Sequence, residues 1–238
     1  MKRKIIITDL TRFANPDEVC TAGYDMSTKE LIRPLPYIKR SDCDRLKINP
    51  GAIIEGEFTP KADRSSPHVE DHNRDKMVYK GPCSADEFKK AITLGLFGSI
   101  ELGFEIAKQD HPRCIPLGHS ISRSIITIAV NPSSIEVVQT SYNGKTSIKV
   151  NFTDAGGKNY SGFPLTDLGF HIYVQGQLAQ KRLQEVNAFI QSQSEVFLRI
   201  GLARQWRNPT TGVEGYWMQV NGIYTFPKYH TDLRGYTA

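Results

Sequence analysis

The chain has 238 residues, of which 39% are hydrophobic and 23% charged, so it can bury a core and is not disordered by composition. A formal net charge of +5 permits a polyanionic partner without requiring one. No apolar run approaches the roughly 20 residues that cross a bilayer, and the apolar stretch after the basic start is too short for a signal peptide. Four scattered cysteines fit a reducing compartment, so we expect a cytoplasmic protein without membrane contact.

Strand patterns dominate the first half of the chain. Ile54 and Phe58 alternate with glutamates, which is the two-residue period of a strand buried on one face. The clear helical exception begins at Ser84, where the residues Ser-Ala-Asp-Glu form a capping box, and Gly95 is expected to end it. Residues 111–118 hold two prolines and a glycine without any period, and we interpret them as the junction between two halves.

The second half repeats this composition of strands and one helix. Residues 134–141 and 146–152 flank an Asn-Gly pair, which favours a type I′ hairpin turn. The register that this turn sets places Val137 opposite Val150, so the apolar faces coincide. A helical pattern covers residues 178–193. The expected fold is therefore mainly β, with two small barrels in tandem, residues 1–118 and 119–238, each with about one helix.

The sequence contains none of the common motifs that bind nucleotides or organise hydrolysis: no P-loop, no dinucleotide fingerprint, no H-E-x-x-H and no G-x-S-x-G. We therefore assign no catalytic residue, no cofactor and no resident metal. The sequence leaves open whether the protein is an enzyme, but it favours a role without catalysis.

The densest polar cluster is the loop that holds His68, Glu70, Asp71 and His72. Two imidazoles with two carboxylates between them could ligate a divalent metal, which is the basis of a metal-dependent enzyme hypothesis. Pro67 and the serines before it favour a loop instead. In such a loop the carboxylates cap backbone N–H groups and pair with arginines, or the loop contacts a ligand.

The last strands carry aromatic and arginine side chains. Arg199 alternates with the apolar residues of 196–202, and Trp217 alternates with Met218, so both are expected to point away from the core. Exposed rings stack on unpaired bases and guanidinium groups bind phosphate. The candidate nucleic-acid-binding residues here are Arg199, Arg204, Trp206, Trp217, Gln219 and Asn221. The alternatives are that Trp217 packs on the other barrel or the helix, and that the arginines pair with Glu195 or Glu214.

A second group of candidates, Arg33, Lys39 and Arg40, lies in the first half. Arg33 is in phase with the apolar residues around it, so it is expected to be partly buried and to need a partner, for which Asp25 is one candidate. The alternative is a phosphate or ligand contact.

Four segments together resemble the dual OB-containing domain family of bacteria and archaea. They are residues 4–7, residues 20–25 with the Leu-Ile-Arg-Pro of 31–34, the loop of 67–72, and residues 198–204 with 219–224. Leu31 departs from the pattern, where an aromatic residue is expected. The resemblance implies two OB folds in tandem and a nucleic-acid-binding role, with prokaryotic systems that act against phage or mobile elements as its setting, and it brings no catalytic residues.

Three hypotheses follow for the function. The first is a cytoplasmic protein that binds DNA or RNA without chemistry. The second is the metal-dependent enzyme built on the loop of 67–72. The third is an adaptor that holds a protein partner on an open barrel edge or on the Trp217 face.

Overall fold

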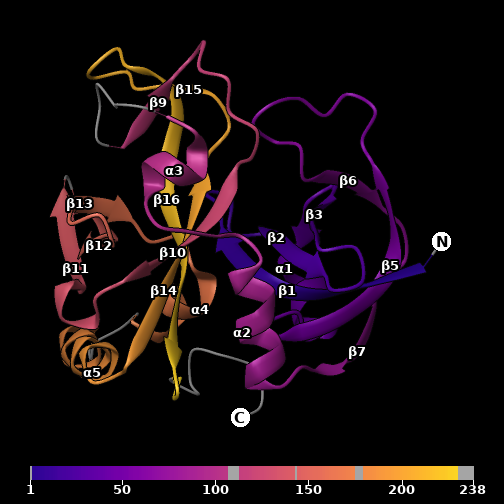
Figure 1. Ribbon diagram of the computed structural model, residues 1–238, viewed down its shortest axis with the longest axis horizontal. Helices are drawn as coiled ribbons and strands as arrows, with labels where there is room; N and C mark the ends of the chain where they lie inside the picture. Colours follow the sequence, from indigo (N-terminus) through magenta and orange to yellow (C-terminus); the bar gives the residue numbers. More distant parts are fainter. Residues whose placement is uncertain (1, 107–112, 143, 175–178, 230–238) are drawn as a thin grey trace.

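The first half of the chain closes into a barrel (Figure 1). The computed structural model describes residues 2–106, 113–142, 144–174 and 179–229. The ring of strands is β1 (Lys2–Arg12), β2 (Glu18–Asp25), β3 (Glu30–Leu35), β6 (Asp71–Arg74) and β5 (Ala52–Pro60), and β5 pairs back onto β1. Only the β3–β6 pair is parallel in this ring. A closed five-stranded barrel of this kind is the OB architecture that the sequence indicated.

The second half forms two sheets that meet around a separate core. The larger sheet is ordered β15 (Trp206–Arg207), β16 (Glu214–Phe226), β14 (Glu195–Leu202), β10 (Ile125–Val130) and β8 (Leu96–Phe97), with β9 (Cys114–Pro116) on β16. The smaller sheet is β11 (Glu136–Tyr142), β12 (Lys145–Thr153) and β13 (Asn159–Pro164). Bridges between Val130 and Asp154 and between Leu165 and Val220 join the two sheets, so they enclose their core as a barrel does.

Short elements complete the fold. They are β4 (Ile38–Lys39) on β2, β7 (Val78–Pro82) on β5, the helices α1 (Arg40–Arg45), α2 (Ala85–Thr93), α3 (Ile100–Phe104), α4 (Leu168–Tyr173) and α5 (Ala179–Gln191), and a 3₁₀ turn (Pro132–Ser134). In Figure 1, α5 lies beside the small sheet, and α2 lies between the two halves.

The mainly β fold is confirmed, and so are the details with the strongest local signals. The Ser84 hydroxyl accepts from the Glu87 N–H and the Glu87 carboxylate accepts from the Ser84 N–H, which is the expected capping box. Val137 pairs with Val150 in the hairpin. The expected helix of 178–193 is α5, and its residue 178 lies outside the described residues.

The expectation of about one helix in each half is too low. α1, α3 and α4 span only five or six residues each. A helix of this length presents too few turns to show an apolar period, so these helices have no detectable pattern in the sequence.

The segment before Gly118 pairs with the second half. β8 pairs with β10 and β9 pairs with β16, and Ile100 and Phe104 of α3 are buried in the second core. The division into domains of residues 1–118 and 119–238 stays a prediction, but strand pairing already passes to the second half at Leu96.

The two halves are joined through a buried ionic contact. β14 is the central strand of the larger sheet; its even-numbered residues face the second core, whereas Arg199 faces β1. The Arg199 side chain is 0% exposed and donates from Nη2 to the Asp9 carboxylate at 2.7 Å and from Nη1 to the Thr127 hydroxyl at 3.0 Å. The Tyr224 hydroxyl donates to the Thr8 carbonyl beside it.

Apolar contacts surround this ion pair. One cluster combines Ile6 and Tyr24 of the first barrel with Phe88 and Ile92 of α2 and with Phe197 of β14. The helix α2 therefore fills the space between the halves, and water is excluded from the ion pair. The two barrels form one packed unit through this layer.

Removing one partner of this pair is expected to destabilise the fold strongly. Arg199→Met leaves the Asp9 carboxylate buried without its cation, which costs on the order of 3–5 kcal/mol of unfolding free energy. Urea unfolding followed by circular dichroism measures this loss. The matched control is Lys89→Met, which breaks an exposed pair with Glu195 and is expected to cost less than about 1 kcal/mol. Equal losses in the two variants would contradict a special role for the buried pair.

Candidate functional site

A cavity of about 510 Å³ opens between the two barrels. The first barrel contributes Arg12 and Phe13 at the end of β1, and Tyr37 before β4. The second barrel contributes Arg204 and Trp206 from the segment after β14 and the start of β15. The cavity is thus built from segments far apart in the chain, and its shape depends on how the barrels dock.

Aromatic side chains from both barrels line this cavity. Trp206 is 50% exposed, and its ring lies 5.6 Å from that of Trp217 at 68°. The Trp217 indole N–H donates to the Trp206 carbonyl at 3.1 Å, which fixes the edge strand β15 beside β16. Phe13 and Tyr37 of the first barrel also line the cavity, and their rings lie 4.6 Å apart at 58°. Flat apolar faces from both barrels therefore line the same space.

Two guanidinium groups accompany the rings. Arg204 donates from Nη2 to Asp71 at 2.7 Å, yet 47% of its side chain stays exposed. Arg12 is exposed, and within the described ranges its side chain forms no ion pair. Its backbone N–H donates to the Thr166 carbonyl, so the strand that carries it is anchored to the second half. Both cations can approach an anion that enters the cleft.

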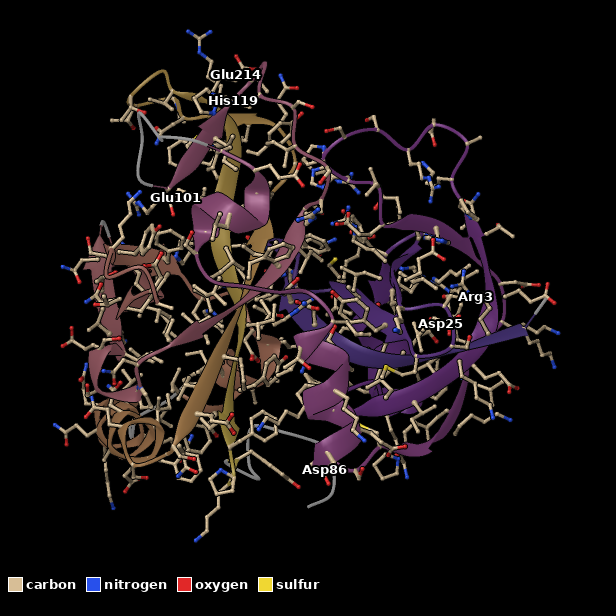
Figure 2. All side chains as sticks on the ribbon, viewed as in Figure 1. Arg3, Asp25, Asp86, Glu101, His119 and Glu214 are labelled. Carbon is tan, nitrogen blue, oxygen red and sulfur yellow. The ribbon has the colours of Figure 1, made fainter. Side chains whose placement is uncertain are left out.

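Arg33 lines the cavity floor but its head group is buried and engaged. Its Nε donates to Asp71 at 2.6 Å and its Nη1 donates to the Ser124 hydroxyl at 3.2 Å. The need for a partner is as expected, but Asp25 is not that partner. Asp25 accepts from Arg3 at 2.6 Å, and Figure 2 shows these two side chains together on the first barrel. Arg33 therefore acts as a link between barrels and not as a surface contact.

Asp25 is buried and belongs instead to a small ionic cluster where β1 begins, β2 ends and β3 begins. Burial alone would raise the pKa of Asp25, but hydrogen bonds from Ser27 and Arg3 outweigh it and hold the pKa below its ordinary value. Arg3 also reaches Glu30 at 2.8 Å. This cluster holds β1, β2 and β3 together and lies outside the cleft.

The loop of 67–72 sends its polar groups in different directions. The Glu70 carboxylate accepts from the Ser124 backbone N–H at 2.7 Å and from its hydroxyl at 2.9 Å. Asp71 is shared by Arg33 and Arg204. His72 approaches Glu30 at 3.1 Å through Nε2, and the buried His68 ring packs edge-on against Tyr216.

The described contacts show what holds these side chains in place. In the part of the chain that the structure describes, no group of three or more His, Cys, Asp or Glu side chains is placed to hold a metal ion. The loop fastens the first barrel to Ser124 directly before β10, and the Ser66 hydroxyl adds a bond to the Ile121 carbonyl. Its carboxylates accept from a backbone N–H group and pair with arginines.

The remaining sequence candidates fall into three environments. Gln219 and Asn221 line the cleft beside Trp206, although Asn221 is itself buried. Arg199 is enclosed by the ion pair described above, so it offers no atom to a ligand in solution. Lys39 is exposed on β4, and Arg40 pairs with Asp44 at 3.4 Å beside a neighbouring cavity of about 410 Å³.

Sequence reasoning assigned no role to Arg12, Phe13 or Tyr37. The available signal was a single aromatic residue, Phe13, inside a polar turn directly after an arginine. An aromatic side chain in a loop has no neighbouring apolar position to pack against locally, so it marks a contact made through tertiary structure.

Comparison with known proteins agrees with this architecture. A family model described as a dual OB-containing domain matches residues 4–223. No curated protein matches the chain. A solved structure described as a replication protein A heterotrimer bound to ssDNA aligns at 10% identity and a TM-score of 0.40, over 93% of this chain and 49% of that one. The chain thus spans about half the length of that protein, and the likeness is too weak to assign a shared ligand. Among the described residues, no helix has the length and apolar character that crossing a membrane requires.

The buried His68 is expected to make stability depend on pH. Burial, followed by the charges of Arg33 and Arg204, lowers its pKa from 6.5 to about 3. Between these values the unfolded chain binds a proton that folded His68 does not, so stability falls as the pH drops below about 6.5, by up to about 1.4 kcal/mol per pH unit. His68→Phe is expected to flatten this fall between pH 6.5 and 4.5, as measured by urea unfolding at each pH.

The control for this prediction is His119→Phe, because His119 is exposed. This variant is expected to reproduce the wild-type dependence. If the His68→Phe profile ran parallel to that of the wild type, His68 would not be the group that titrates.

Proposed function

The chain belongs to the dual OB-containing domain family, and on that premise we propose that it binds single-stranded nucleic acid in the cleft between its barrels, without changing it chemically. The observation that carries the proposal is one cavity lined by aromatic rings from both barrels, Phe13, Tyr37 and Trp206, and by the guanidinium groups of Arg12 and Arg204. Rings that stack on bases and cations that meet phosphates are the two requirements of single-strand binding.

The geometry favours an unpaired strand over a duplex. The aromatic faces are useful only to bases whose own faces are free, and a base pair inside a duplex already stacks on its neighbours. A cavity of about 510 Å³ is on the scale of small-ligand sites, so it suits a short stretch of one strand and not the width of a double helix. Stacking tolerates every base, and the strand can be DNA or RNA.

The fixed docking of the barrels supports a preformed site. Asp9 with Arg199, Glu70 with Ser124 and Asp71 with Arg204 all cross between the halves. A cleft whose walls are held in this way loses little conformational entropy when a ligand enters, which favours affinity. The accessory role in a prokaryotic system against phage or mobile elements belongs to this proposal as its biological setting, and loss of protection after deletion of the gene would test it.

Trp206→Ala is expected to weaken binding of single strands because it removes a stacking platform. Stacking contributes about 1–3 kcal/mol for each base, which corresponds to a Kd about 5- to 150-fold higher. Fluorescence anisotropy with labelled strands of about 12 nucleotides, in DNA and RNA forms and beside a duplex, measures this change. The control is Leu102→Ala, an exposed residue on α3 that does not line the cleft. Wild-type affinity in Trp206→Ala would remove Trp206 from the site.

Failure of the wild-type protein to bind any strand at low salt would refute the proposed function itself. Recovery of one protein at stoichiometric yield, without nucleic acid, would favour the adaptor hypothesis in its place.

Arg12→Ala is expected to change the salt dependence of binding more than the base preference. Each phosphate contact that is lost makes the slope of log K against log salt less negative by about 0.7 for a single strand. Anisotropy titrations over a range of salt concentrations give this slope. Lys90→Ala is the control, because Lys90 is exposed on α2 away from the cleft, and its slope should equal that of the wild type. An unchanged slope in Arg12→Ala would contradict a phosphate contact at Arg12.

A further inference from the structure

A chain of side-chain hydrogen bonds leads from the buried ion pair to the cleft. The Asp9 carboxylate accepts from the Asn221 Nδ2 group at 3.2 Å. The Asn221 Oδ1 atom in turn accepts from the Gln219 Nε2 group at 3.1 Å. Gln219 is half-buried and lines the cavity together with Trp206. The chain therefore connects a charge in the core to an amide at the surface of the site.

The direction of this chain is fixed at its buried end. Arg199 donates to Asp9 from both Nε and Nη2, so this carboxylate acts as an acceptor only. Asn221 must then turn its NH₂ group toward Asp9 and its oxygen toward Gln219. An inverted amide would set two acceptors or two donors against each other, at a cost of about 1–3 kcal/mol for a buried group.

Close packing holds Asn221 in this position. Its side chain lies against Gly201 of β14, the residue that pairs with Gln219, and an added Cβ atom at Gly201 would lie 2.5 Å from Asn221 Nδ2. The Thr166 hydroxyl also reaches Asn221 Oδ1 at 3.4 Å. The packing holds the Asn221 side chain in place, and its hydrogen bonds decide which way the amide faces: the NH₂ group meets the Asp9 carboxylate, and the oxygen accepts from Thr166 and Gln219.

Gln219 consequently has one N–H engaged with Asn221, while its carbonyl oxygen and its second N–H remain for a ligand. Resting on the function proposed above, we propose that Gln219 reads the edge of the base that stacks on Trp206, and that this contact favours adenine. A donor and an acceptor held side by side are what a glutamine needs to form two bonds with one base edge.

Adenine is the base whose edges fit this arrangement most often. Its amino group lies beside a ring nitrogen acceptor on both the Watson–Crick and the Hoogsteen edge, so either orientation in the cleft offers a donor next to an acceptor. The Hoogsteen edge of guanine presents two acceptors, so guanine, like each pyrimidine, offers a suitable pair on its Watson–Crick edge only. Adenine also stacks over a larger area than a pyrimidine does.

The experiment compares oligo-A, oligo-C and oligo-U of equal length at one salt concentration, with DNA counterparts, by fluorescence anisotropy. The wild-type protein is expected to bind the adenine strand about 5-fold or more tightly than the others, because adenine offers a fitting edge in either orientation and stacks over a larger area. Gln219→Met keeps the length of the side chain but removes its polar groups. It is expected to bring the three strands within about 2-fold of one another and to leave the salt slope unchanged.

The matched control is Gln205→Met. Gln205 lines the same cavity, but its amide donates to Glu214 and takes no part in the chain from Asp9. It should therefore keep the adenine preference. As a second variant, Gln219→Glu sets a carboxylate oxygen against Asn221 Oδ1, and it is expected to lose the preference while near-ultraviolet circular dichroism still shows a folded protein.

The outcomes separate this inference from the proposed function. If the wild type binds all three strands alike, or if Gln219→Met keeps the preference, the role of Gln219 is refuted and single-strand binding stands. If no strand binds, the proposed function fails and the role of Gln219 fails with it.

Discussion

The structure depends on one buried ion pair, Asp9 with Arg199, which joins the first strand of one barrel to the central strand of the other. Both side chains are buried, with Arg199 0% and Asp9 3% exposed, so each would be strongly destabilising without its partner. Any slide or rotation of one barrel on the other separates the two charges, and the pair therefore selects one docking geometry. The ion pair contributes mainly to the specificity of docking between the two barrels. The apolar cluster around α2 supplies contact area, but apolar contacts alone would tolerate small displacements of one barrel on the other.

The cleft follows from that geometry. Its walls belong to different barrels, and no element of either barrel alone encloses the space. The loop of 67–72 adds a second fastening, with Glu70 on Ser124 and with Asp71 held between Arg33 and Arg204. Arg204 connects structure to function in this arrangement, because the same guanidinium closes the ionic contact and presents its exposed side to the cavity. The residues that hold the barrels together and the residues that face a ligand are thus neighbours.

The side-chain amides of Asn221 and Gln219 link the buried ion pair to the surface of the cleft. Asp9 orients Asn221, and Asn221 orients Gln219. The buried ion pair therefore fixes the direction of the Gln219 amide, which would not be fixed in a surface loop. Regular strand alternation keeps Trp217 and Gln219 on one face, and a register shift in the β14–β16 pair directly after Val220 places Asn221. Rigid placement of this kind is a requirement for reading a base and not only stacking on it.

The sequence by itself determined the local structure. The two-residue period identified the strands and the direction of their side chains, the capping box identified α2, and the Asn-Gly pair set the register of Val137 against Val150. It also placed Met218 and Val220 toward the core and Trp217 away from it, as the structure has them. Short helices such as α3 escaped detection because they complete too few turns to show a period.

Only the tertiary structure decided what those side chains meet. The two-residue period correctly predicts that Arg199 points away from the core of its own barrel. The first barrel covers the face to which Arg199 points. An arginine that the pattern predicts to be exposed is therefore fully buried. Arg33 was expected to need an acid, and the choice between Asp25 and Asp71 required the parallel pairing of β3 with β6. Periodicity reports on neighbours within one sheet, whereas burial, charge pairing and the cleft arise between segments nearly 200 residues apart, such as Asp9 and Arg199 at a separation of 190.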